Sequence, residues 1–143
     1  MVASIVGTPP TQFLDLARQV FELDARGRAA PHELATAIER TFERIYVEMS
    51  TVIGQGGFAA VVERALYDTT ADCPWLDAET MVAGLRPAPS RLAAILERES
   101  RELVLDCVIR CVGAVLALLS DFIGESLTIR LIHRAWAQTP LET

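Results

Sequence analysis

The chain contains no lysine, and all 13 of its basic residues are arginine. A lysine amine is needed in a P-loop phosphate site, a Schiff base and a pyridoxal enzyme, so these classes are excluded. The 19 acidic residues give a formal net charge of −6. Because phosphate contacts need a basic surface, this balance argues against nucleic acid as a partner. The lack of a polybasic run also weakens binding to anionic membranes.

Histidine and cysteine are scarce as well. The two histidines, His32 and His133, cannot form a His-rich metal site. The three cysteines are odd in number, and their spacing matches no disulfide framework or zinc ribbon. Cys107 and Cys111 lie one helical turn apart, but a zinc site would need Cys73 and His133 beside them. Since a buried thiol usually packs as a small hydrophobic group, we expect three free cysteines and no metal or other cofactor.

The sequence also lacks a recognisable targeting segment. Its first ten residues carry no positive region followed by a long apolar run, so we expect no signal peptide and a reducing cytoplasmic location. Residues 103–119 approach the length of a membrane span but contain Asp106 and Arg110. Two such charges at the centre of a span would each cost about 2.5–3.5 kcal/mol. The segment is therefore expected to be a buried helix of a soluble protein, with no membrane partner.

The most prominent feature that is present is the apolar segment 103–123. Two adjacent apolar stripes run through it at helical spacing: Leu105, Ile109, Val112, Leu116, Leu119, Ile123 and Val104, Val108, Cys111, Val115, Leu118, Phe122. A helix that is apolar over so much of its circumference must be surrounded by other helices. The length of 143 residues fits one domain. We therefore predict a single all-α domain over residues 1–143, a bundle of five or six helices around the central helix 103–123.

The other helices are expected from apolar periodicity, capping residues and breakers. No internal repeat and no strand-like alternation are identified. The expected helices run from near Thr8, as the cap, to Gly27, over 31–54, over 58–70, over a short stretch within 77–85, over 91–123 and over 126–137 before Pro140.

A third stripe of the central helix is the first candidate functional surface. It comprises Asp106, Arg110, Gly113, Ala117, Ser120 and Gly124. Glycine inside a helix costs about 1 kcal/mol relative to alanine, so Gly113 requires a packing reason. Two interpretations stay open, namely a helix contact across a dimer axis and ordinary packing within one subunit.

No catalytic constellation is recognisable in this sequence. The glycine run 54–57 lacks the lysine and the preceding strand of a phosphate loop and is read as a tight turn. The leading hypothesis is a non-enzymatic interaction or accessory protein that binds itself, as a homodimer, or another protein. The alternative is a module for a small apolar ligand, held in a pocket between helices that is lined by Phe42, Tyr46, Met49, Cys111 and Phe122. A third hypothesis, an enzyme, requires a cleft in which Asp106, Arg110, Glu125 or His133 converge with shifted acidities.

Three segments of the chain carry a resemblance to known sequences. They are GQGGFAAVVERAL at 54–66, CPWL at 73–76 and FIGESLTIRL at 122–131 followed by Trp136. Together they resemble a family of small bacterial all-helical proteins of uncharacterised function. The resemblance implies a bacterial, cytoplasmic setting. Because the shared motifs are packing motifs, it transfers no catalytic residue.

Overall fold

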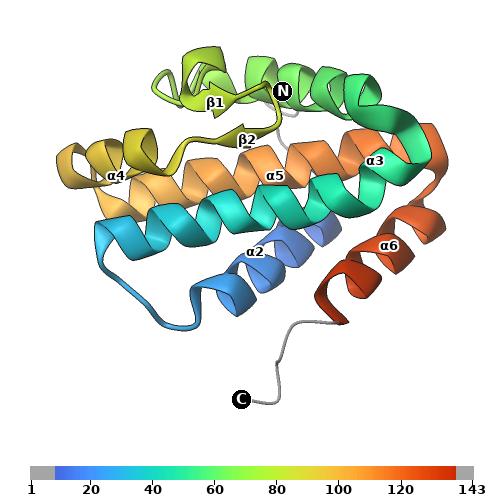
Figure 1. Cartoon of the computed structure of the whole chain (residues 1–143), viewed down its shortest axis with the longest axis horizontal. Coiled ribbons are helices and arrows are strands. Elements are labelled where there is room, and N and C mark those ends of the chain that lie inside the picture. Colours follow the sequence, from blue (N-terminus) through green and yellow to red (C-terminus); the bar gives the residue numbers. More distant parts are fainter. Residues whose placement is uncertain (1–8, 138–143) are drawn as a thin grey trace.

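The structure is a computed structural model that describes residues 9–137. Its elements are α2 (Thr11–Ala25), α3 (Pro31–Thr70), the 3₁₀ helix η1 (Ala78–Thr80), β1 (Met81–Val82), β2 (Arg86–Pro87), α4 (Pro89–Arg98), α5 (Arg101–Ile123) and α6 (Glu125–Ala137) (Figure 1). The two short strands form one antiparallel hairpin. The prediction of an all-α bundle is confirmed.

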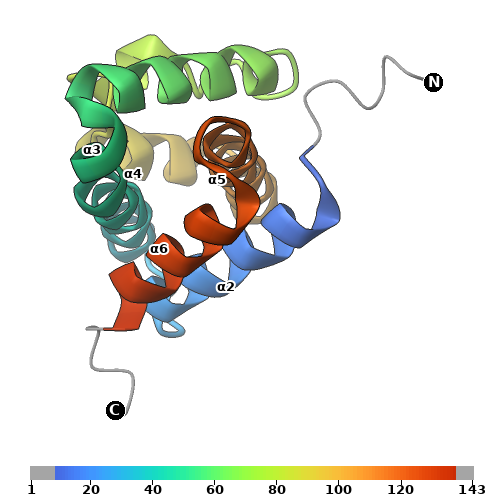
Figure 2. The same cartoon turned by 90° about the vertical axis from the view of Figure 1, so that its right-hand side faces the viewer.

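The core of the bundle surrounds α5, as its apolar circumference predicts. Eleven of its residues, between Val104 and Leu119, are buried. In the end-on view of Figure 2, α3 and α5 lie beside one another, with the last part of α3 on one side of the pair and α6 on the other. The two ends of α5 emerge from this cover, since Leu103 is 45% and Phe122 71% exposed.

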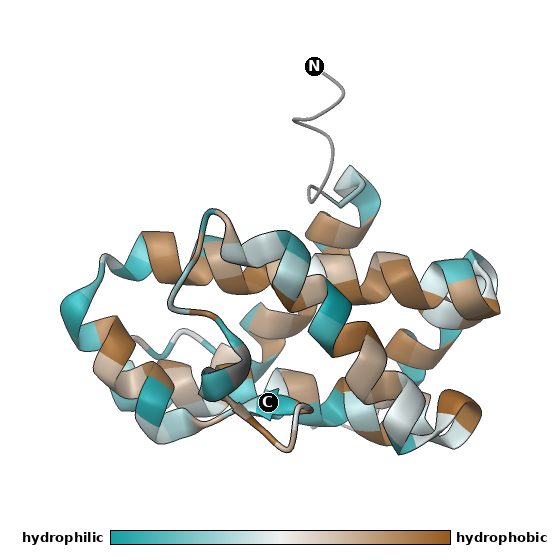
Figure 3. Ribbon diagram, turned by 90° about the horizontal axis from the view of Figure 1, so that it is seen from above, coloured by the Kyte–Doolittle hydropathy of each residue, from teal (hydrophilic) through white to brown (hydrophobic). Residues whose placement is uncertain are grey.

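The helix surfaces explain this arrangement. Hydrophobic and hydrophilic residues alternate in blocks along each helix in Figure 3. The apolar faces meet in one core cluster, whose largest fully buried side chains include Phe42, Phe58, Ile38, Ile45, Met49 and Leu116. By length and composition α3 and α5 could each cross a membrane, but the core helix of a soluble protein passes the same test.

The expected long helix over 91–123 is wrong, because the chain breaks between α4 and α5. Glu99 is extended, with φ −101° and ψ 163°, and Ser100 caps α5 by accepting a hydrogen bond from the Leu103 amide at 3.3 Å. Residues 97–102 carry charges and no apolar side that could hold a continuous helix against a neighbour. The Ser100 side chain, which accepts a hydrogen bond from the first turn of α5, therefore favours the start of a new helix over continuation of α4.

The glycine run interrupts α3 less than expected. Only Gly54 leaves helical geometry, with φ 79° and ψ 163°, so α3 consists of a first arm, 31–53, and a second arm, 55–70. Gly56 and Gly57 belong to the second arm, which therefore begins before the expected residue 58. The expected boundary at Gly27 is confirmed by its left-handed φ of 78°. Thr8, the expected cap, and Pro140 lie outside the described residues.

Residues 71–88 connect α3 to α4 without an α-helix, so the helix expected within 77–85 is also wrong. Asp77 does cap a turn, since its Oδ1 accepts hydrogen bonds from the amides of Glu79 and Thr80 at 3.1 and 3.2 Å. The turn extends only to the 3₁₀ helix η1. The chain then reverses at Ala83 and Gly84, which have φ of 56° and 72° and end helical growth.

The structure contains an internal repeat that was not predicted from the sequence. When 70 is added to each residue number, the first arm of α3 corresponds to α5, Gly54 to Gly124 and the second arm of α3 to α6. Over 51–67 and 121–137 the buried and exposed positions coincide residue by residue. Each half consists of a short helix, a long helix, a glycine hinge and a returning helix. The halves interlock, because α2 packs most extensively on α5, and α4 on α3.

Candidate functional site

The chain's own N-terminal part covers the middle of the predicted helix-contact stripe of α5, at Gly113. A Cβ built on Gly113 would lie 3.2 Å from Leu14 Cδ2 and 3.3 Å from Pro9 Cγ. The glycine therefore allows the start of α2 to approach α5 closely. Ala117 and Ser120 are half-buried, and Gly124 is exposed at the hinge. Packing within one chain explains Gly113 without a second copy.

The other end of this stripe is polar. Arg110 Nε lies 3.4 Å from Asp106 Oδ2, an ion pair between residues one turn apart. The Asp106 side chain is 58% exposed and that of Arg110 is 23% exposed.

The predicted pocket-lining residues differ widely in their exposure. Phe42, Met49 and Cys111 are fully buried in the core. Tyr46 is half-buried and packs edge-on against Phe58, with ring centroids 5.6 Å apart. Phe122 is exposed at the end of α5. None of the five lines the grooves described next.

An apolar groove of about 380 Å³ lies between α2 and α6. We call it the α2–α6 groove; its lining is Leu16, Gln19, Val20, Leu23, Ile132, His133, Trp136 and Ala137. The two helices lie side by side in both views (Figures 1 and 2). They come from opposite ends of the described chain, so no local pattern could reveal their contact.

Trp136, at the base of this groove, is held by a buried polar network. The Asp24 side chain is 1% exposed and accepts hydrogen bonds from Thr41 Oγ1 at 2.8 Å and Arg44 Nε at 3.0 Å. The Arg44 guanidinium carbon lies 5.9 Å from the centre of the Trp136 ring, a cation–π distance. Arg44 therefore holds the Trp136 ring in place, while the partly exposed Leu16 and Leu23 face the groove.

A second, larger groove of about 600 Å³ lies where the α2–α3 loop faces the start of α5. Phe21, Leu34 and Leu105 form part of its apolar lining. Its charged lining comprises Glu22, Arg28, Arg101 and Glu102. Because cations and carboxylates are equal in number, the groove has no preferred sign of ligand charge.

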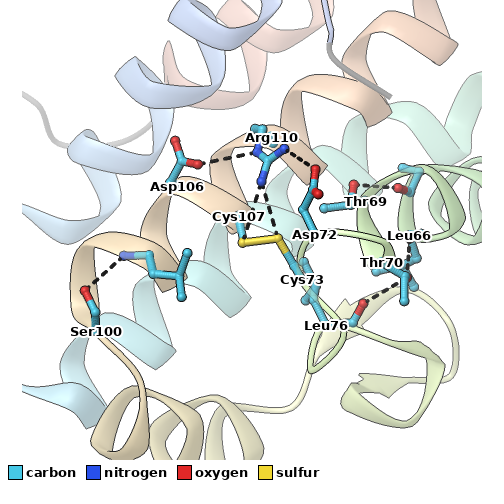
Figure 4. Close-up of a disulfide and its surroundings, with 12 residues drawn as sticks. Leu66, Thr69, Thr70, Asp72, Cys73, Leu76, Ser100, Asp106, Cys107 and Arg110 are labelled. Carbon is cyan, nitrogen blue, oxygen red and sulfur yellow. Dashed lines mark hydrogen bonds and ion pairs between the residues drawn. A yellow bond between two sulfur atoms is a disulfide. The ribbon is translucent and has the colours of Figure 1, made fainter. Parts of the chain in front are cut away.

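Cys73 and Cys107 form a disulfide, which corrects the expectation of three free thiols (Figure 4). The two Cα atoms lie 6.1 Å apart, and the bond ties the 71–88 connection to α5. Cys107 is therefore not free to act with Cys111 as a pair of metal ligands, and within residues 9–137 no group of three or more His, Cys, Asp or Glu residues could hold a metal ion. Sequence alone missed the pairing because the partners lie 34 residues apart.

The guanidinium of Arg110 lies against this disulfide. Its Nη2 is 3.6 Å from Cys73 Sγ and 4.0 Å from Cys107 Sγ, while Nη1 is 3.0 Å from Asp72 Oδ2. Cys111, one turn further along α5, is free and fully buried. Burial raises the pKa of the Cys111 thiol to about 12, and a hydrogen bond with Thr69 offsets part of that effect. The Cys111 thiol therefore stays protonated at neutral pH.

The residues required for the enzyme hypothesis are spread along the bundle. Asp106 and Arg110 adjoin the disulfide, whereas Glu125 follows the far end of α5, about 25 Å away at the helical rise per residue. His133 is exposed on α6 and lines the α2–α6 groove.

Comparison of the chain with protein-family models, curated proteins and solved structures finds no match.

Proposed function

We propose that this chain is a non-enzymatic interaction protein that forms a homodimer through the α2–α6 groove. The observation that carries the proposal is the apolar lining of the groove, with Leu16, Leu23 and Trp136 on two neighbouring helices. Apolar residues clustered around an anchored tryptophan are typical of the energetic centre of a protein interface.

The charges beside the groove favour a second copy as the partner. The exposed side of α2 carries Asp15, Arg18 and Glu22, with Arg18 paired to Asp15 at 3.7 Å. The exposed side of α6 carries Arg130 and Arg134, of which Arg134 also pairs with Glu48 of α3 at 3.5 Å. In a two-fold dimer, α2 of each copy faces α6 of the other, so the acidic edge meets the basic edge twice.

Light scattering over a micromolar concentration series tests the dimer. We expect the wild-type chain to be dimeric and the double variant Leu16→Glu/Leu23→Glu to be monomeric, because two charges would be buried without partners. Leu103→Glu is the matched control, since Leu103 is 45% exposed on α5 outside the groove. It should leave the dimer intact, and circular dichroism checks that each variant is folded.

A charge exchange tests the orientation of the two copies. Glu22→Arg and Arg130→Glu should each weaken association, because each single substitution places like charges opposite one another across the interface. The two substitutions together should restore association, because opposite charges then face one another again. A strictly monomeric wild type, or a groove variant that dimerises as the wild type does, would contradict the proposal.

A small apolar ligand is the second candidate occupant of the same groove. The volume of about 380 Å³ lies within the range of small-molecule pockets. Anilinonaphthalene sulfonate is a suitable probe, with Trp136 as the fluorescence donor in a Trp75→Phe background. Saturable binding of one probe per monomeric chain, lost in Leu16→Glu/Leu23→Glu and kept in Leu103→Glu, would favour this function over dimerisation.

A further inference from the structure

We propose that the Cys73–Cys107 disulfide is a redox-active pair that exchanges with a dithiol reductant, and that Arg110 stabilises the thiolate released. Thiol–disulfide exchange is faster when the leaving sulfur is a better-stabilised thiolate. A neighbouring cation provides that stabilisation. The guanidinium of Arg110 reaches both sulfur atoms, at 3.6 and 4.0 Å (Figure 4).

The placement of the two cysteines decides which sulfur leaves. Cys107 and Arg110 are three residues apart on α5, so the guanidinium stays within reach of Cys107 when the connection around Cys73 opens. Cys73 lies in the 71–88 connection, which has no α-helix and contains only the 3₁₀ helix η1 and two short strands. Both cysteines are buried, so attack requires local opening of the chain around Cys73. Opening at this position leaves the Cys107 sulfur in place on its helix.

Arg110 contacts both sulfur atoms and is itself paired with Asp72 and Asp106. Both carboxylates bind the guanidinium, and their side chains are 68% and 58% exposed. The Arg110 side chain is only 23% exposed. Because water screens the two exposed carboxylates more strongly, the closer and less exposed cation dominates at the sulfur atoms. The free thiol of Cys111, also on α5, stays protonated and takes no part.

The exchange is a two-electron reduction of the protein. A thiolate of the reductant attacks Cys73 Sγ, the Cys73–Cys107 bond breaks, and its electron pair stays on Cys107 as a thiolate beside Arg110. The second thiolate of the reductant then attacks the mixed disulfide and releases the Cys73 thiolate. The reductant leaves as a disulfide, and the two protons that it lost are available to the two protein thiolates.

Reduction loosens the 71–88 connection without dismantling it. The Arg110–Asp72 ion pair, the buried Leu76 and the ion pair between Arg86 and Glu39 at 2.6 Å remain as non-covalent contacts. The reduced protein is therefore expected to stay folded, which makes oxidation and reduction reversible.

The rate of reduction of the native protein tests the proposal. The chain is incubated with dithiothreitol at pH 7, quenched with N-ethylmaleimide and weighed by mass spectrometry. We expect two added alkyl groups, on Cys73 and Cys107, with Cys111 unmodified. Arg110→Gln should slow the reaction about three- to tenfold, and Arg110→Lys, which keeps a cation, should recover part of the rate. Arg64→Gln, which also removes an ion pair to a carboxylate one turn along, is the matched control and should not change the rate.

A second measurement separates the stability of the Cys107 thiolate from the rate at which the chain opens around Cys73. In a Cys73→Ser background, the pH profile of Cys107 alkylation gives the pKa of the Cys107 thiol. The pKa of this thiol should rise when Arg110→Gln is added, because the neighbouring cation favours the thiolate. Reduction of the wild type only in denaturant would overturn the proposal, as would a Cys107 profile that Arg110→Gln leaves unchanged.

Discussion

At the scale of single residues, the buried carboxylate of Asp24 is the group in the described core that depends most on its partners, because a buried charge must be paired and hydrogen-bonded. It lies between α2 and α3 and depends on Thr41 and Arg44 for its hydrogen bonds. Arg44 in turn faces the ring of Trp136 on α6. One arginine thus joins three helices at the base of the α2–α6 groove, and its loss affects more than one ion pair.

Arg44→Met is predicted to destabilise the protein by about 3 kcal/mol, because removal of one partner leaves a buried carboxylate without its counter-ion. Arg40→Met is the matched control, since Arg40 is exposed on the same helix. It should change stability by less than about 0.5 kcal/mol. Urea denaturation followed by circular dichroism gives both free energies of unfolding. Equal effects of the two substitutions would show that the Asp24–Arg44 pair contributes nothing.

The cysteines show how far local sequence predicts a residue's role. The spacing of Cys107 and Cys111 placed them correctly on one helix, and the burial of Cys111 fits the expected small hydrophobic group. The partner of Cys107 instead comes from the 71–88 connection, whose path depends on the hairpin and on the packing of Leu76. No local pattern contains that information.

At the scale of elements, two glycine hinges give the bundle its shape. Gly54 and Gly124 have φ of 79° and 95° with ψ of 163° and 148°, a region that essentially only glycine adopts. At each hinge a long helix ends and the next helix runs across it in a different direction (Figure 2). Both positions are exposed and open, so backbone conformation and not crowding requires the glycine.

Gly54→Ala and Gly124→Ala are each predicted to destabilise the protein by about 1–3 kcal/mol, the cost of a non-glycine residue in such a conformation. Gly56→Ala is the control two residues away. It has open space and a helical backbone, so it should stabilise the protein by about 0.5 kcal/mol through the unfolded state. Thermal denaturation compares the three variants. A hinge variant as stable as the wild type would show that a helix can pass through this point without strain.

At the scale of the whole molecule, the two halves depend on one another. The main neighbour of α2 is α5 in the other half, and the main neighbour of α4 is α3. Neither half therefore buries its long helix alone. This interlocking also explains why α5 is covered on more sides than an amphipathic helix would be.

Cleavage at a protease site inserted between Ala83 and Gly84 is predicted to leave the two fragments associated, even with the Cys73–Cys107 disulfide reduced. The turn is exposed, and the apolar contacts between the halves do not pass through it. Size-exclusion chromatography under reducing conditions measures the result. Insertion of the same length without cleavage is the control. Separation of the fragments without denaturant would mean that the halves do not hold one another.

The sequence by itself determined the all-α class, the central position of 103–123 and the positions of the glycine breaks. These follow from apolar periodicity and from backbone conformations that few residues adopt, and both are local properties. Only the tertiary structure decided what covers Gly113, which cysteines pair and that α2 and α6 form a groove. Each of these depends on residues far apart in the chain, whose contact is set by the packing of whole helices.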